Sequence, residues 1–266
     1  MLPLLIALGL AAPAPDELIW SDEFDGAALS SQRWSALDDC WGGGNDERQC
    51  YTPGNVTVAN GLLRITARRE GHRGPAQPRR KGGPQVTRAF TSGKIETRGK
   101  ASFLYGRIAV RAKLPEGQGL WPAIWLLPEH DNYGPYPQSG EIDLAEAVNL
   151  GAHCRFCLRG ERRVFGALHH GWSPESNRQI GGDRPLPSSP DGFHVFVLDW
   201  TPRRMTWSVD GHRYFSTATR QPFDQRFHLI LNLAVGGRWP EGQNAGGIDA
   251  KALPATLLVD WVRVYR

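Results

Sequence analysis

The strongest pattern in this sequence is a series of short segments in which apolar and polar residues alternate. Clear examples are 61–67 and 106–114, and in the second Ile108, Val110 and Ala112 fall on one face. Alternation with a period of two indicates half-buried β-strands. No stretch keeps a period of 3.6 residues over a convincing length, and 31 glycines and 20 prolines supply frequent turns. This pattern predicts an all-β sandwich or barrel rather than alternating strands and helices.

The C-terminal half adds further strand signals. Segments 193–200 and 257–266 have strand character, and 205–215 contains Asp210-Gly211, a typical two-residue hairpin turn. Segment 228–237 is almost continuously apolar, as expected for a strand buried on both faces. A single all-β domain can reach 266 residues, and no linker divides the chain, so we expect one domain over residues 15–266.

Residues 1–14 resemble a secretory signal peptide. They carry no charge, their apolar run is too short to span a bilayer, and they end in small residues around Ala11 and Ala12. The positive residues that usually begin such a signal are missing, so a buried strand is the alternative. We expect export, to a secreted or periplasmic location. No other segment could span a membrane.

The four cysteines allow three disulfide pairings: Cys40, Cys50, Cys154 and Cys157. An exported protein permits disulfides, and local pairing of Cys40 with Cys50 and of Cys154 with Cys157 is the simplest arrangement. A zinc or redox site at Cys154-x-x-Cys157 is the rival interpretation. Because Cys40 and Cys50 do not repeat that spacing, we favour disulfides.

The net charge of +4 is local rather than general. Residues 68–88 hold seven Arg or Lys and one Glu, so this stretch carries +6 and the rest of the chain −2. The basic stretch is rich in glycine and proline, and no aromatic residue is interleaved with its cations, as stacking of nucleic-acid bases would require. A solvated loop is favoured over a polyanion contact, and no nucleic-acid partner is expected.

The most informative stretch is 139–148, which carries Glu141, Asp143 and Glu146. Residues i and i+2 of a strand share a face, so Glu141 and Asp143 point the same way. Glu146 joins them only if a β-bulge at Leu144 or Ala145 inserts one extra residue. Three acids on one face repel one another, so a purely structural protein would gain little from this arrangement. Paired carboxyls suit a retaining glycosidase, with a calcium site or a solvated acidic face as the alternatives.

Ten tryptophans add a second signal, because indole faces stack on sugar rings. Trp121 and Trp125 come shortly before the acids, and Trp239 follows a Gly-Gly turn, so we expect these three at a carbohydrate surface. For Trp200, Trp207 and Trp261, core positions are favoured.

Taken together, these residues resemble glycoside hydrolase family 16, and most closely its laminarinase-like members, which are endo-β-1,3-glucanases. The resemblance covers nearly all of residues 15–266. The stretches that carry it are SDEFDG, WGGGNDERQCYT, YGRIAVRAKLPEGQGLWPAIWLLP, SGEIDLAEAV, GALHHG, DGFHVFVLDW, QPFDQRFHLILNLAVGGRWP and VDWVRVY. The resemblance implies a β-jelly-roll sandwich of two antiparallel sheets with a concave substrate cleft.

The resemblance also implies roles for the acids. Glu141 is the expected nucleophile, Glu146 the expected general acid/base, and Asp143 lies between them to orient the nucleophile and influence proton sharing. Further substrate-binding positions follow from the same match: Trp121, Trp125, His169, Trp239 and Asn45. Lys94 departs from the pattern, since many relatives have arginine there.

Calcium enters as a structural possibility, with Glu23, Gly61 and Asp260 at the matching positions. No cofactor is expected for the chemistry. The expected partner is a β-1,3-glucan, and a monomer is expected. Two alternatives remain: the same chemistry on mixed-linkage glucan, agar or carrageenan, and a non-catalytic β-glucan-binding module.

Overall fold

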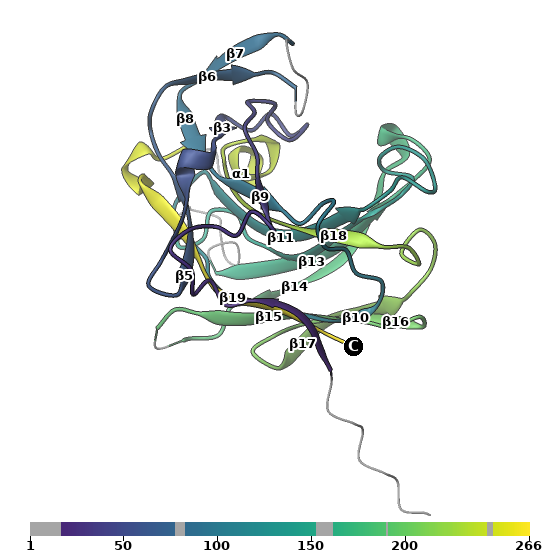
Figure 1. Cartoon of the computed structure of the whole chain (residues 1–266). Helices are drawn as coiled ribbons and strands as arrows, with labels where there is room; N and C mark the ends of the chain where they lie inside the picture. Colours follow the sequence, from purple (N-terminus) through teal and green to yellow (C-terminus); the bar gives the residue numbers. More distant parts are fainter. Residues whose placement is uncertain (1–16, 78–82, 153–161, 190, 244–246) are drawn as a thin grey trace, which may run out of the picture.

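Two β-sheets lie one above the other in Figure 1 and form the body of the molecule. The computed structural model describes residues 17–77, 83–152, 162–189, 191–243 and 247–266. One sheet has eight strands in the order β17-β16-β15-β10-β19-β5-β4, with β1 paired to β19, and the other has seven in the order β14-β13-β12-β11-β18-β9-β2. Neighbouring strands in both sheets are antiparallel. The predicted all-β sandwich is confirmed.

The eight-stranded sheet consists of β1 (Leu18–Asp22), β4 (Val56–Ala59), β5 (Leu62–Ala67), β10 (Gly106–Lys113), β15 (His194–Trp200), β16 (Arg204–Val209), β17 (His212–Ala218) and β19 (Ala255–Tyr265). The seven-stranded sheet consists of β2 (Ser35–Ala36), β9 (Lys94–Glu96), β11 (Leu120–Pro128), β12 (Glu141–Glu146), β13 (Arg163–His170), β14 (Arg178–Pro185) and β18 (Phe227–Val235).

Two small strand pairs and four short helical segments complete the described part. The strand β3 (Gln49–Tyr51) runs parallel to β8 (Phe90–Ser92), and β6 (His72–Pro75) pairs with β7 (Gln85–Arg88). The helical segments are η1 (Pro53–Asn55), η2 (Pro174–Ser176), η3 (Ala250–Ala252) and α1 (Arg238–Gln243). In Figure 1 the β6–β7 hairpin rises above the seven-stranded sheet on one side, and teal loops rise on the other.

The hydrophobic core lies between the two sheets, as the alternating sequence pattern requires. Ile108, Val110 and Ala112 of β10 are fully buried there. All nine residues of β18 are buried, which confirms the prediction for this apolar run. Alternate residues of β18 from Phe227 to Val235 belong to the core, so Asn232 lies on the other face, which we call the outer face of the seven-stranded sheet.

The sequence did not indicate α1, which begins directly after Gly236 and Gly237. Both glycines have positive φ, +67° and +104°, and turn the chain sharply. Glu241 then stabilises one helical turn, because its side chain accepts a hydrogen bond from the Gly237 N–H at 2.8 Å. A loop was expected here, and a six-residue helix is found.

The Cys40–Cys50 disulfide is present, so that half of the predicted pairing is confirmed. Cys154 and Cys157 lie outside the described residues, as does the expected signal at 1–14. Within the described part, no helix has the length and apolar character that crossing a membrane requires.

Candidate active site

The predicted β-bulge is present in β12, and Leu144 is the extra residue. Asp143 pairs with Trp125 of β11, and Ala145 pairs with the next residue along, Ile124, which leaves Leu144 without a partner position. Leu144 and Ala145 are both buried in the core. Glu146 therefore returns to the outer face, where Glu141 and Asp143 also lie.

Strand pairing brings His169 of β13 to the acids, because Glu141 and His169 are directly opposite each other. One ligand atom from each of Glu141, Asp143 and His169 lies within 4.8 Å of the others. His169 Nε2 is 3.2 Å from Asp143 Oδ2. The other ring nitrogen, Nδ1, is 3.3 Å from the side-chain amide of Asn177, which also donates to the Tyr136 hydroxyl. His169 therefore lies beside the acids, and its expected part in substrate binding stays a prediction.

Burial raises the pKa of all three carboxyl groups. Burial and the neighbouring Asp143 charge raise the pKa of Glu141 to about 8, and burial raises that of Asp143 to about 7. The pKa of Glu146 is also raised well above its ordinary value, by burial and by the charges of Asp143 and Glu141. These raised pKa values keep protons on the acidic cluster near neutral pH.

The tryptophans singled out by the sequence surround these acids. Trp121 of β11 donates its indole N–H to Glu146 Oε1 at 2.9 Å. Trp239 of α1 packs edge-on against Trp121 and against Phe165, with ring centroids 5.3 and 5.1 Å apart. Phe165 is opposite Glu146 in the sheet, so these rings form an aromatic cluster beside the Glu146 carboxyl.

A buried polar network, which sequence reasoning missed, holds Trp125. The Trp125 indole N–H donates to Asn232 Oδ1 at 2.6 Å, and the Asn232 amide donates to the Tyr51 hydroxyl at 3.1 Å. The Tyr51 hydroxyl in turn donates to Glu47 Oε2 at 2.9 Å. The one available signal was Asn232 itself, an amide within an otherwise apolar run.

Lys94 and Asn45 adjoin this region. The Lys94 ammonium lies 4.5 Å from the ring centroid of Trp125, a cation–π distance. The main-chain carbonyl of Asn45 accepts a hydrogen bond from the N–H of Arg238, the first residue of α1, at 2.8 Å. Asn45 therefore braces the helix that carries Trp239.

The candidate calcium ligands are engaged with arginines. The Glu23 carboxylate accepts two hydrogen bonds from Arg263, at 2.8 and 3.0 Å, and Asp260 accepts one from Arg111 at 2.6 Å. Gly61 lies in the turn between β4 and β5. A calcium ion bound to these two carboxylates would compete with both guanidinium groups. The calcium site stays a prediction.

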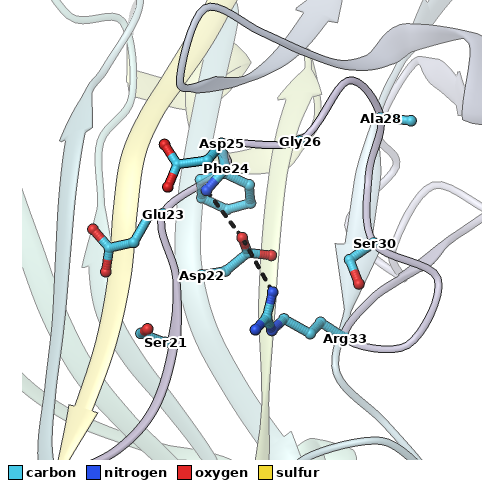
Figure 2. A pocket seen from close by; sticks show the side chains of 9 residues that line it. All are labelled: Ser21, Asp22, Glu23, Phe24, Asp25, Gly26, Ala28, Ser30 and Arg33. Atoms are coloured by element: carbon cyan, nitrogen blue, oxygen red, sulfur yellow. Dashed lines mark hydrogen bonds and ion pairs between the residues drawn. The ribbon is translucent and has the colours of Figure 1, made fainter.

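Glu23 also lines a pocket formed by residues between Ser21 and Arg33 (Figure 2). In this pocket, the Asp22 carboxylate accepts hydrogen bonds from the Phe24 N–H at 2.9 Å and from the Trp34 indole N–H at 2.8 Å. Arg33 Nη1 lies 3.9 Å from Asp22 Oδ1. None of the residues that line this pocket belongs to the acidic cluster. The acidic cluster and this pocket are therefore formed by different residues.

Comparison with known proteins assigns the family. The model of the family described as "Glycosyl hydrolases family 16" matches residues 44–263. The chain is 39% identical to a beta-glucanase of Rhodothermus marinus, over 94% of this chain and 85% of that protein. It is 38% identical to glucan endo-1,3-beta-glucosidase A1 of Niallia circulans, over 94% of this chain but only 38% of that longer protein.

The solved structures agree with the sequence matches. The X-ray structure of the laminarinase from Rhodothermus marinus superposes with a TM-score of 0.78 at 39% identity, over 95% of this chain and 98% of that one. The similarity thus extends over the two sheets and the strand that carries the acids. The chain belongs to glycosyl hydrolase family 16.

Proposed function

We propose that this protein is a retaining endo-β-1,3-glucanase. The observation that carries the proposal is the buried acidic cluster on the outer face of β12, with its raised carboxyl pKa values. Carboxyl groups with perturbed pKa values beside aromatic side chains are typical of sites that cleave a glycosidic bond. Glu141 attacks the anomeric carbon, and a covalent glycosyl–enzyme forms as the bond to the leaving oxygen breaks. Glu146 donates its proton to that oxygen, then takes one from the water that releases the sugar.

The charges around the two glutamates support this division of roles. Asp143 favours the protonated form and His169 the ionised form of both glutamates, whereas Lys94 favours the ionised form of Glu141, which a nucleophile needs. Glu146 has the negative charges of Asp143 and Glu141 for neighbours, and these favour the protonated form that an acid catalyst needs. The different surroundings of the two glutamates therefore favour an ionised Glu141 and a protonated Glu146.

The pH dependence of kcat/KM should reflect this charge arrangement. Ionisation of Glu141 is required, so activity should rise with pH through an apparent pKa above the ordinary glutamate value, towards the value of about 8 in the free protein. Lys94→Gln should move this acidic limb to higher pH, because loss of a nearby cation favours neutral Glu141. Lys94→Arg keeps the charge and should leave the limb in place. An unshifted limb in Lys94→Gln would contradict the electrostatic role.

Metal ions should be dispensable for turnover. Glu141, Asp143 and His169 have metal-ligating spacing among the described residues, but the proposed mechanism uses these groups as nucleophile and proton partners. We expect dialysis against EDTA to leave kcat on laminarin unchanged. A loss of activity that added calcium or zinc restores would show that a metal takes part.

The substrate proposal draws on the relatives and on the surface. In the described part, four aromatic side chains are exposed, and all lie in loops: Tyr133 and Tyr136 between β11 and β12, Trp172 after β13, and Trp41 between β2 and β3. Such side chains suit stacking on a sugar polymer. The relatives named above are glucanases, one with stated β-1,3 specificity.

Reducing-end release should be measured on laminarin, lichenan, agarose and carrageenan, with Glu141→Gln beside the wild type. Activity on laminarin, lost in the variant, supports the proposal. Activity confined to a galactan would support the proposed mechanism but would contradict β-1,3-glucan as the substrate. Binding of laminarin without products from any polymer would favour a binding module instead.

We further propose that the protein is exported, on the basis of the signal-like residues 1–14, and that it is a monomer. The Cys40–Cys50 disulfide agrees with an oxidising destination. In exported protein we expect thiol labelling before and after reduction to show all four cysteines oxidised. Free thiols at Cys154 and Cys157 would contradict the second disulfide.

A further inference from the structure

Two side chains of the eight-stranded sheet donate hydrogen bonds to the main chain of the bulge that orients Glu146. The main-chain carbonyl of Asp143 accepts a hydrogen bond from the Trp207 indole N–H at 2.8 Å, and that of Leu144 accepts one from the Tyr214 hydroxyl at 3.2 Å. Trp207 comes from β16 and Tyr214 from β17, so both bonds cross the core. A bulge disrupts the strand ladder locally, and side-chain donors can satisfy carbonyls there.

The strand opposite the bulge has a glycine where these two donors need space. Gly166 of β13 lies between Ala167, which pairs with Asp143, and Phe165, which pairs with Glu146. A Cβ added at Gly166 would lie 2.5 Å from Trp207 Cδ1 and 2.8 Å from the Tyr214 hydroxyl. The φ of Gly166 is not in the left-handed region, so the glycine is needed for space. The donors therefore reach the bulge only because this position lacks a side chain.

Neither donor belongs to the outer face where the acids lie. Trp207 has no exposed surface and belongs to the hydrophobic core, and Tyr214 is half-buried and packs against that core. The two bonds end on the consecutive residues Asp143 and Leu144, which only Ala145 separates from Glu146. A change in either bond would alter the backbone that sets the separation of the Asp143 and Glu146 carboxyls.

We propose that Trp207 and Tyr214 are positioning residues that fix the catalytic bulge and thereby the relative placement of Asp143 and Glu146. This inference rests on the proposed function of the acidic cluster. Small displacements of reacting groups cost large factors in rate, so loss of one of these bonds should lower kcat by about tenfold or more. KM should change little, because neither side chain lies on the sugar-facing side of the sheet.

The test removes each donor and keeps an aromatic ring at each position, the smaller phenyl ring in place of the indole at Trp207. Trp207→Phe deletes the indole N–H, and Tyr214→Phe deletes a hydroxyl from a half-buried side chain, a mild change for folding. Trp200→Phe is the matched control: its indole N–H also donates to a buried carbonyl, that of Phe223 at 3.1 Å, in the same core but away from the bulge. All three variants should lose some thermal stability.

The expected result is a fall in kcat on laminarin for Trp207→Phe and Tyr214→Phe, with KM retained, while Trp200→Phe keeps the wild-type kcat. The carboxyl ¹³C titration of Asp143 and Glu146 should shift in the first two variants and not in the control. This titration needs no substrate, so it tests the positioning role even if the wild type cleaves none of the polymers. Wild-type kcat and an unshifted titration in both bulge variants would overturn the inference, as would equal effects in Trp200→Phe.

Discussion

Glu141→Gln should lower kcat on laminarin by on the order of 10⁴-fold or more, because the amide cannot form the glycosyl–enzyme. Laminarin binding should persist, since the aromatic cluster of Trp121, Trp239 and Phe165 is untouched. Both quantities can be measured on the same preparation, by reducing-end release and by affinity electrophoresis in laminarin.

The same substitution should stabilise the fold at alkaline pH. Burial raises the pKa of Glu141 to about 8, above its ordinary value near 4.5 in the unfolded chain. The folded state therefore holds this proton more tightly, and the associated stability is lost as pH rises from about 4.5 through about 8. Because the amide does not ionise, the melting temperature of Glu141→Gln should exceed that of wild type by more at pH 9 than at pH 5.

Glu116→Gln is a suitable control for both effects. It makes the same chemical change at an exposed glutamate that pairs with Arg162 at 2.9 Å. It should keep the wild-type kcat and the wild-type pH dependence of melting. Substantial turnover by Glu141→Gln, with this control unaffected, would show that another group is the nucleophile.

Glu146→Gln should cost about 10²–10⁴-fold in kcat on laminarin, the usual contribution of a general acid/base. The loss in the glycosylation step should be much smaller for an aryl glucoside with a highly acidic leaving group, since that oxygen departs without a proton. With Glu146→Ala, added azide should restore turnover and give a β-glycosyl azide, because a small anion needs no general base. Equal losses on both substrates, with no azide rescue, would contradict the acid/base role.

The sequence predicted the strands and the acidic cluster well, because both depend on local periodicity. Alternation located β5 and β10, and the spacing of the acids in β12 required the bulge that pairing then placed at Leu144. The substrate-binding role of His169 was expected from family resemblance, and the register of β12 with β13 places this residue opposite Glu141.

Features that depend on tertiary contacts were not predictable from the pattern. Trp207 was expected in the core and is buried there, yet its indole bond to the Asp143 carbonyl connects two strands far apart in sequence. The helix α1 depends on one Glu241 side chain that reaches back to Gly237. Asp260 and Glu23 accept hydrogen bonds from Arg111 and Arg263, contacts that no local sequence signal could indicate.

The most direct test of the mechanism is the anomeric configuration of the first product, followed by ¹H NMR while laminari-oligosaccharides are cleaved. Double displacement through Glu141 predicts that the new reducing end appears first as the β-anomer and then mutarotates towards equilibrium. Initial release of the α-anomer would mean a single displacement by water and would contradict the assignment of Glu141 as nucleophile.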